Sequence, residues 1–337
     1  MQRIDNPANR RRRNAVRSVL ALASVALLPP SFVCAQSPGR PFRIGIVGVG
    51  SPEGATAILQ ALNEGLQEQG LVEGREIESV YRWARSVDEL LALARELANL
   101  PVDVIVASNN THIAAAQRAT STIPIVMVLG VDPVRHGFIE SLARPARNIT
   151  GLTNDVGPSM HGKMLGLLKD VVPMASVIGV LVQQGLGFDR IALDEAARLL
   201  GIRLNYASDV RHPHDIEPAF EAMKRAGSQA VYVIGGGLIY QQRQAVVALA
   251  LRHRLPSLHF SSDYVRDGAL LSYGTDLRAQ YRRSAWYVSR ILRGEKAADL
   301  PVEQPSRLEL VINVKTAKVL GITIPQSLLL RADHVIE

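Results

Sequence analysis

The sequence has 337 residues, of which 47% are apolar and 20% charged, a balance typical of a folded globular protein rather than a disordered one. This length exceeds one ordinary domain core, so two lobes are expected. The net charge of +7 would favour a nucleic-acid partner, but six arginines and one aspartate among residues 1–35 supply +5 of it, and the remaining +2 argues against nucleic-acid binding.

Residues 1–35 have the order of an export signal. The positively charged region Arg10–Arg17 precedes the apolar stretch Val19–Leu28, which is too short to span a bilayer. Val33-Cys34-Ala35 predicts cleavage after Ala35 and a mature protein in the periplasm. That cleavage removes the one cysteine, and with it any disulfide, thiolate nucleophile or cysteine metal ligand. Twin-arginine export through Arg12-Arg13 and an uncleaved anchor are the alternatives.

From residue 42 onward, apolar runs alternate with stretches of helical periodicity. Runs that are apolar on both faces are typical of parallel strands covered by helices. They predict strands at 42–49, 77–84, 102–107 and 123–129, with helices at 52–69, 88–100 and 113–120. This order predicts a doubly wound α/β sheet. Residues 133–155 add a predicted short helix and a strand at 148–153.

A second series of the same kind begins near residue 160. It predicts helices at 160–171, 189–200, 215–226 and 239–253, and strands at 176–182, 202–208, 229–234, 257–261 and 269–273. A helix at 277–293, an extended stretch at 298–305, a strand at 308–313, a short helix at 316–320 and a tail follow. Because so much chain remains, we expect it to revisit both lobes. Lobe one is predicted at 42–152 plus 275–303, and lobe two at 153–274 plus 304–337.

Two of the predicted strands end in small polar turns. Ser108-Asn109-Asn110-Thr111 follows the strand at 102–107, and Gly130-Val131-Asp132 follows the strand at 123–129. In open α/β sheets, ligands bind at this carboxyl edge. Ser108, Asn110 and Thr111 are expected to cap the next helix, whose N–H groups and dipole could hold a carboxylate. Helix capping without a ligand is the alternative interpretation.

The common catalytic and cofactor motifs are missing. Gly45, Gly48 and Gly50 match the dinucleotide pattern only in part, because its third glycine position holds Glu53, which would repel pyrophosphate. No GxxxxGK[ST], HExxH or GxSxG stretch occurs. We therefore expect no nucleotide, no cofactor and no catalytic residue.

The histidines do not form a metal motif. His212 and His214 flank Pro213 in what is more simply a solvated loop than a metal site. Three more histidines are scattered along the chain, and none has a sequence neighbour that would make it a general base; they are His112, His136 and His161.

Four stretches resemble a bacterial ABC-transporter substrate-binding family. They are DPVRHGFIESLARPARNITGLT (132–153), ALLSYG (269–274), LRGEKAADLPVEQPSRLELVINVKTAKVLGI (292–322) and IPQSLLLRADHVIE (324–337). The resemblance covers nearly all of 42–337. It implies the type I periplasmic binding protein fold, with two Rossmann-like lobes, a multi-strand hinge and a ligand in the cleft. Relatives in this family include aromatic amino-acid binders such as a tryptophan-binding lipoprotein.

The resemblance also implies ligand contacts from the turns that follow the strands. Asp263 would pair with an ammonium group and Asn110 and Thr111 with a carboxylate, while Tyr273 would lie near the hinge. The implied turns are Gly50-Ser51, Ser108–Thr111, Val131-Asp132, Gln183–Asp189 and Gly235–Leu238. The ligand contacts predicted from the resemblance are Gly50, Ser51, Ser108, Asn110, Thr111, Asp132, Gly236, Leu238, Asp263 and Tyr273. The chain departs from many relatives at 183–189 and at 235–237.

We expect an exported, monomeric solute-binding protein. It would deliver a small organic solute, such as an amino acid or a related carboxylate, to an ABC permease by hinge closure. A periplasmic ligand sensor of the same fold that feeds a membrane receptor is the alternative, and a gene neighbourhood with a permease and an ATPase would separate the two. A periplasmic enzyme is a third possibility, against which the missing motifs argue.

Overall fold

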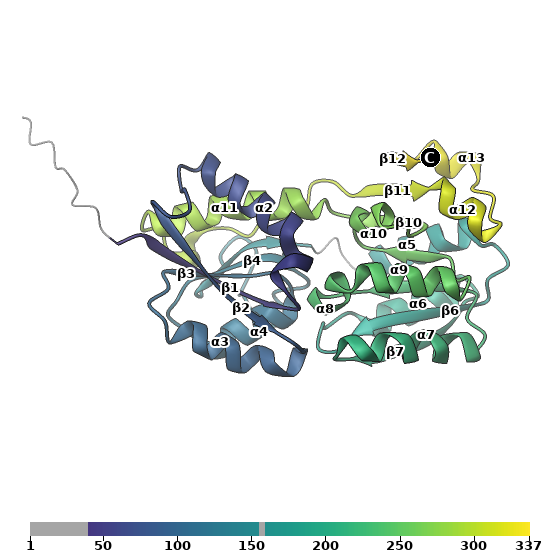
Figure 1. The fold of residues 1–337 in the computed structure, drawn as a ribbon, viewed down its shortest axis with the longest axis horizontal. Helices are drawn as coiled ribbons and strands as arrows, with labels where there is room; N and C mark the ends of the chain where they lie inside the picture. Colours follow the sequence, from purple (N-terminus) through teal and green to yellow (C-terminus); the bar gives the residue numbers. More distant parts are fainter. Residues whose placement is uncertain (1–39, 155–158) are drawn as a thin grey trace, which may run out of the picture. The chain divides into compact units, whose positions relative to one another are not determined.

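The computed structural model describes residues 40–154 and 159–337, which contain two sheets of mainly parallel strands with helices on both faces (Figure 1). The predicted export signal, its cleavage site after Ala35 and Cys34 lie outside these residues. Within them, no helix is both long enough and apolar enough to cross a membrane.

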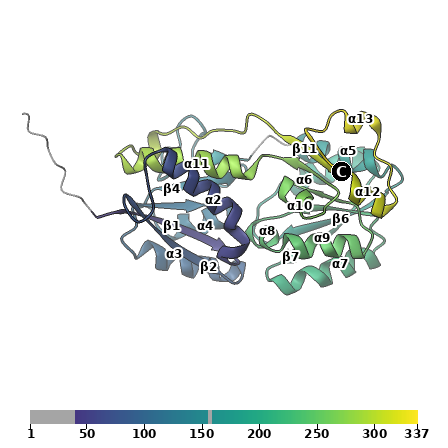
Figure 2. The same ribbon diagram turned by 45° about the horizontal axis from the view of Figure 1, so that its top comes forward.

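The first sheet has the strand order β2-β1-β3-β4-β5, and all of its pairs are parallel. Helices α2 and α11 cover one face and α3 and α4 the other (Figures 1 and 2). We call this part lobe one. Its elements are β1 (Phe42–Val49), α2 (Pro52–Glu68), β2 (Ile77–Ala84), η1 (Val87–Glu89), α3 (Leu90–Ala98), β3 (Val104–Ala107), α4 (Asn110–Ala119), β4 (Ile125–Gly130), β5 (Ile149–Thr153), α11 (Leu277–Leu292) and η3 (Ala297–Asp299).

The second sheet has the strand order β12-β11-β10-β9-β8-β6-β7, in which β10 and β11 form an antiparallel pair. Helices α5 and α6 pack together, and α7 packs with α9. We call this part lobe two. Its elements are α5 (Ser159–Val171), β6 (Val177–Gln183), α6 (Arg190–Leu199), β7 (Arg203–Val210), η2 (Pro213–Asp215), α7 (Ile216–Arg225), β8 (Ala230–Ile234), α8 (Gly237–Gln241), α9 (Arg243–Arg252), β9 (Ser257–His259), α10 (Ser262–Arg266), β10 (Leu271–Gly274), β11 (Glu309–Asn313), α12 (Val314–Leu320), α13 (Gln326–Leu329) and β12 (His334–Ile336).

The local sequence explains where β1 ends and α2 begins. The six residues from Ile44 to Val49 of β1 are buried, as expected for a central strand covered on both faces. Ser51 then takes an extended backbone conformation and accepts a hydrogen bond from the Gly54 N–H, while Pro52 occupies the first helical turn of α2. The predicted α/β class and the doubly wound order are confirmed.

Three predictions about individual elements are wrong. The short helix expected within 133–147 is a series of turns, because Pro133, Gly137 and Pro145 interrupt any helical hydrogen-bond ladder. The helix expected at 239–253 is divided at Gln242 into α8 and α9. The tail forms a strand, β12, which is mostly exposed and too short to give a periodic signal; its parallel pairing with β11 defines it.

Helix α11 brings a late segment of the chain back to lobe one. The chain leaves the second sheet at 275–276, forms α11 against α2, and pairs Glu303 with Leu152 before it enters β11 (Figure 2). Thr150 Oγ1 also donates a hydrogen bond to Leu300 O at 2.6 Å. The exact lobe boundaries given above stay a prediction.

Gly65 is where α2 and α11 approach most closely. A Cβ atom at this position would lie 2.9 Å from the Ala285 Cβ and closer still to the Arg282 carbonyl oxygen. We predict that Gly65→Ala lowers the free energy of unfolding by about 1–3 kcal/mol, because the backbone of α11 cannot give way. Urea unfolding measures this. Gly166→Ala in α5 is the matched control, since a Cβ atom there would meet nothing within 4 Å and alanine should stabilise the helix by roughly 0.5–1 kcal/mol.

His259 in β9 makes the stability depend on pH. The residue is fully buried, stacks on Tyr264 and shares a hydrogen bond of 2.9 Å with Ser257 Oγ. Burial lowers the pKa of His259 to about 3, so the folded protein keeps it neutral. The unfolded chain protonates it below about pH 6.5. Because the unfolded state then binds more protons, the free energy of unfolding falls as the pH drops from about 6.5 toward 3.

The expected size of this effect is up to about 1.4 kcal/mol per pH unit, and the residue contributes no pH dependence above about pH 6.5. Urea unfolding of wild type and His259→Gln at a series of pH values measures it, and the variant should show the smaller slope. His214→Gln, at an exposed position, should keep the wild-type slope. Equal slopes in wild type and His259→Gln would contradict the prediction.

Candidate functional site

A cavity of about 330 Å³ lies between the two lobes. Lobe one contributes the end of β1 and the turns after β3 and β4, and lobe two contributes the turns after β6 and β8. Residues of α2, β2, α5, α8 and α11, together with Phe260, also line it. This volume lies at the lower end of the range for small-molecule sites, about 300–1,000 Å³. The cavity is therefore the candidate ligand site.

The cavity wall is largely apolar and rich in aromatic rings from both lobes. Such walls favour a flat, apolar body in the ligand, because aromatic rings pack well on one another. The aromatic wall residues are Trp83, Phe188, Tyr232, Tyr240, Phe260 and Tyr281.

The predicted turn after β3 lies at the cavity, but the residue that caps α4 differs from the prediction. Asn109 is the N-cap of α4, since its Oδ1 accepts hydrogen bonds from Thr111 N at 3.1 Å and from Thr111 Oγ1 at 2.6 Å. The predicted capping by Ser108, Asn110 and Thr111 is wrong. Ser108 Oγ instead accepts a hydrogen bond of 2.7 Å from the Tyr281 hydroxyl.

Asn110 joins the two predicted polar turns. Its Nδ2 donates to Val131 O and its Oδ1 accepts from Val131 N, both at 2.8 Å. The next residue, Asp132, has φ 45°, a left-handed conformation that aspartate adopts more readily than most residues. The side chain of Asp132 accepts a hydrogen bond of 3.3 Å from Arg135 N. Both turns are thus held at one edge of the sheet, as the sequence predicted for parallel strands.

Four of the predicted contact residues line the cavity, namely Ser108, Asn110, Asp132 and Gly236. The other six are not among its lining residues. Gly50 and Ser51 lie beside Gln241, and Thr111 faces Gln183 Nε2 at 3.5 Å. Leu238 is fully buried, and its N–H donates to Gln183 Oε1 at 2.9 Å. The Tyr273 hydroxyl is bound by the Lys163 amine.

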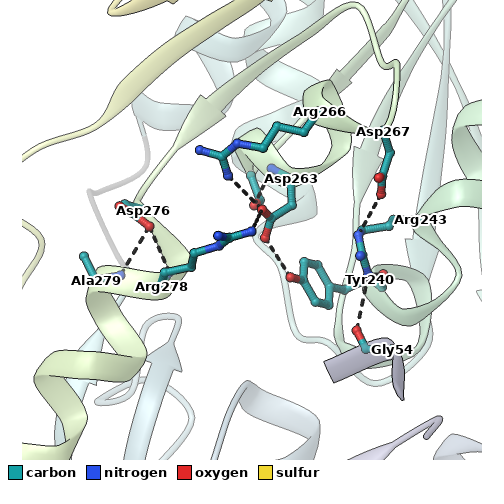
Figure 3. A network of polar contacts seen from close by, with 10 residues as sticks. Gly54, Tyr240, Arg243, Asp263, Arg266, Asp267, Asp276, Arg278 and Ala279 are labelled. Atoms are coloured by element: carbon teal, nitrogen blue, oxygen red, sulfur yellow. Dashed lines mark hydrogen bonds and ion pairs between the residues drawn. The ribbon is translucent and has the colours of Figure 1, made fainter. Parts of the chain in front are cut away.

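Asp263, the sixth of these residues, is buried and already paired (Figure 3). Its Oδ2 accepts a hydrogen bond of 2.7 Å from the Tyr240 hydroxyl, and its Oδ1 pairs with Arg266 at 2.9 Å and Arg278 at 3.4 Å. Burial, and then the charge of Asp263, raises the pKa of Tyr240. Asp263 therefore fixes the orientation of an aromatic wall residue.

A neighbouring contact in the same network crosses between the lobes. Arg243 pairs with Asp267 at 2.8 Å within lobe two and donates a hydrogen bond of 3.3 Å to Gly54 O in lobe one (Figure 3). Arg243 also donates a hydrogen bond of 3.4 Å to the carbonyl oxygen of Tyr240, so it connects an aromatic wall residue with the start of α2.

Further contacts between lining residues join the lobes. Arg135 of lobe one pairs with Asp189 of lobe two at 2.9 Å, and His136 Nε2 lies 3.0 Å from Gly187 O. The Ala192 N–H and then the Arg135 guanidinium hold the pKa of Asp189 below its usual value. These contacts are partly exposed to solvent, which screens the charges, so each contributes little to stability.

Three histidines that the sequence showed only as scattered residues share this cavity: His112 from α4, His136 from the turn after β4 and His161 from α5. His161 Nδ1 lies 3.2 Å from the Tyr232 hydroxyl, and burial lowers its pKa although Asp189 acts in the other direction. His112 and His136 closely follow the predicted polar turns, so their positions in the sequence could have marked them as site residues. His161 has no such signal. Among the described residues, no group of three or more His, Cys, Asp and Glu could hold a metal ion.

We predict that Asp263→Ala lowers the free energy of unfolding by about 1–3 kcal/mol, because the Tyr240 hydroxyl and the arginines lose a buried acceptor. Arg266→Ala should cost less than about 1 kcal/mol, since its side chain is 54% exposed. Urea unfolding of the two variants compares them. An unchanged unfolding midpoint in Asp263→Ala would contradict this assignment.

The chain is similar along most of its length to known binding proteins. The family model described as ABC transporter substrate binding protein matches residues 43–336. The Tyrosine-binding protein of Clostridioides difficile is 25% identical over 259 residues, which cover 76% of this chain and 74% of that protein.

Two solved structures are also similar. A conserved domain protein from Vibrio cholerae O1 biovar El Tor superposes with a TM-score of 0.78 at 28% identity, over 88% of this chain and all of that one. An ABC domain from Streptococcus pneumoniae in complex with L-Trp superposes with a TM-score of 0.77 at 23% identity, over the same shares of the two chains. The family match over nearly the whole described chain shows that this protein belongs to the ABC transporter substrate-binding protein family.

Proposed function

We propose that the protein is an exported solute-binding protein that holds one small aromatic solute between its lobes and delivers it to an ABC permease. The solute class is an aromatic amino acid or a related carboxylate. Family membership supports the binding role, and the relative named Tyrosine-binding protein supports the solute class.

The observation that carries the proposal is the aromatic lining of the cavity. Rings come from both lobes, with Trp83 in lobe one and Phe188 and Tyr232 in lobe two. A solute between them gains contacts with both lobes only when the lobes are together. Binding would therefore favour the closed state through this difference in contacts, which is how hinge closure is driven.

The proposed contact residues follow from the cavity edge. Ser108, Asn110 and Asp132 would act from lobe one and Gly236 from lobe two, since all four line the cavity. The N-terminal end of α4 offers a partial positive charge that suits a carboxylate. Residues that do not line the cavity would act indirectly; they are Gly50, Ser51, Thr111, Leu238, Asp263 and Tyr273.

Cleavage of the N-terminal segment after Ala35 and release into the periplasm are part of the proposal. Delivery would then occur at the outer face of the inner membrane. We also propose that the protein acts as a monomer without nucleic acid, cofactor or catalytic activity.

The two tryptophans allow a direct test of binding. Trp83 lines the cavity, whereas Trp286 lies on α11 and does not line it. We predict that L-tyrosine or L-phenylalanine changes the tryptophan fluorescence of the wild-type protein in a saturable way. Trp286→Phe should keep the ligand-induced change, and Trp83→Phe should lose it, because only Trp83 is in reach of the solute.

Calorimetric titration with the same amino acids, and with glycine and L-lysine as controls, accompanies the fluorescence measurement. Heat and fluorescence changes should occur with the aromatic compounds only. A wild-type protein that responds to no aromatic amino acid, while its melting curve shows a folded state, would rule out the proposed solute class.

A further inference from the structure

His112 has an unusual environment for a buried histidine. It is the third residue of α4, only 3% of its surface is exposed, and it lines the cavity between the lobes. Both of its ring nitrogens are buried without a hydrogen-bond partner in the described part of the chain. A buried polar group without a hydrogen bond lowers stability by about 1–3 kcal/mol. A ligand atom that bonds to the ring would remove this cost.

The other two cavity histidines differ in this respect. His136 Nε2 lies 3.0 Å from Gly187 O, and His161 Nδ1 lies 3.2 Å from the Tyr232 hydroxyl. Each of these rings thus has a protein partner for at least one nitrogen. His112 alone among the three has hydrogen-bonding capacity on both nitrogens available to a ligand.

Glycine in lobe two creates the space for this ring. A Cβ atom at Gly237 would lie 2.8 Å from His112 Cε1 and 2.9 Å from His112 Nε2. At Gly236, a Cβ atom would lie 2.6 Å from Nε2 of Gln183, whose Oε1 accepts the N–H of Leu238. A side chain at Gly237 would push the lobes apart or displace the imidazole, whereas one at Gly236 would displace Gln183 within lobe two. Gly237 therefore lets lobe two approach His112 closely.

The surroundings of His112 favour an anionic partner. The ring lies in the first turn of α4, a helix of 10 residues whose N-terminus carries partial positive charge. Burial lowers the pKa of His112 to about 4, so the ring is neutral near pH 7 and can donate one hydrogen bond. A carboxylate that accepts this bond gains a partner and is also favoured by the helix dipole.

We propose that His112 is a ligand-contact residue that donates a hydrogen bond to the carboxylate of the bound aromatic solute. This inference rests on the proposed function and extends it by assigning the carboxylate end of the solute to one side chain. The aromatic end then lies among the rings of the wall.

The proposal has a consequence for the pH dependence of binding. A carboxylate beside the ring raises the pKa of His112 above its value in the empty cavity, so binding takes up protons as the pH falls. Affinity should therefore rise as the pH falls through the pKa of His112 in the bound state, and level off below its pKa of about 4 in the empty cavity. The other titratable groups of the cavity are Asp132, Arg135, His136, His161 and Asp189 with the hydroxyls of Tyr232, Tyr240 and Tyr281, and they are shared by wild type and His112 variants.

Three related compounds serve as probes in calorimetric titration of the full chain. L-tyrosine has both charged ends, its deaminated analogue hydroxyphenylpropionate has only the carboxylate, and tyramine has only the ammonium. The His112→Phe variant should bind both carboxylate probes about 10- to 100-fold more weakly than wild type, the loss expected for a hydrogen bond to a charged group. The variant should bind tyramine with the same affinity as wild type. His112→Gln should recover part of the carboxylate affinity without the pH dependence.

Melting curves of the ligand-free proteins separate this role from a structural one. His112→Phe should melt at the wild-type temperature or above, because it removes an unpaired buried polar group. His214→Gln, at an exposed site outside the cavity, is the control and should match wild type in affinity and pH profile.

The outcomes distinguish the two proposals. If wild type binds the carboxylate probes and His112→Phe binds them equally well, the role of His112 is overturned and the proposed function stands. A wild-type protein that binds none of the three probes overturns both. Weaker carboxylate binding in His112→Phe, with unchanged tyramine binding and a preserved melting temperature, supports the inference.

Discussion

The paired hydrogen bonds between the Asn110 side chain and the Val131 backbone are the constraint on which the ligand edge of lobe one depends. The amide both donates to and accepts from Val131 at 2.8 Å, beyond the point where β3 and β4 pair with each other. Asn110 is buried, so each of these groups would cost about 1–3 kcal/mol if left unpaired. The pair keeps Ser108 and Asp132 at one edge and sets the first turn of α4, with His112, against the cavity.

The lobes meet where side chains are small and where charges are already paired. Gly237 lies against the His112 ring, and Arg135 and Asp189 form an ion pair at the rim. Buried carboxylates need partners, and Asp263 obtains them from arginines and from the Tyr240 hydroxyl within the wall. The charge of Asp263, which does not line the cavity, thus orients a wall residue, while aromatic rings and a neutral imidazole form part of the inner surface.

Much of the fold could be predicted because burial on both faces leaves a clear signal in the sequence. The strand at 42–49 agrees with β1 to the residue, and β1 is buried from Ile44 to Val49. The strand at 77–84 agrees with β2 to the residue, although this edge strand is mostly half-buried. The sequence pattern did not predict elements that depend on contacts with distant segments of the chain. The β12 strand is short and mostly exposed, and only its pairing with β11 defines it. The break at Gln242 between α8 and α9 likewise contains no glycine or proline that would have predicted it.

The sequence by itself determined that polar turns at 108–111 and 130–132 lie at one sheet edge, because parallel buried strands present their carboxyl ends together. Only the tertiary structure decided which of these side chains are available to a ligand. Asp263 is paired by Arg278 from another helix, and His112 meets Gly237 from the other lobe. Periodicity reports whether a residue is buried, but hydrogen-bond partners and close approaches arise only when distant segments pack together.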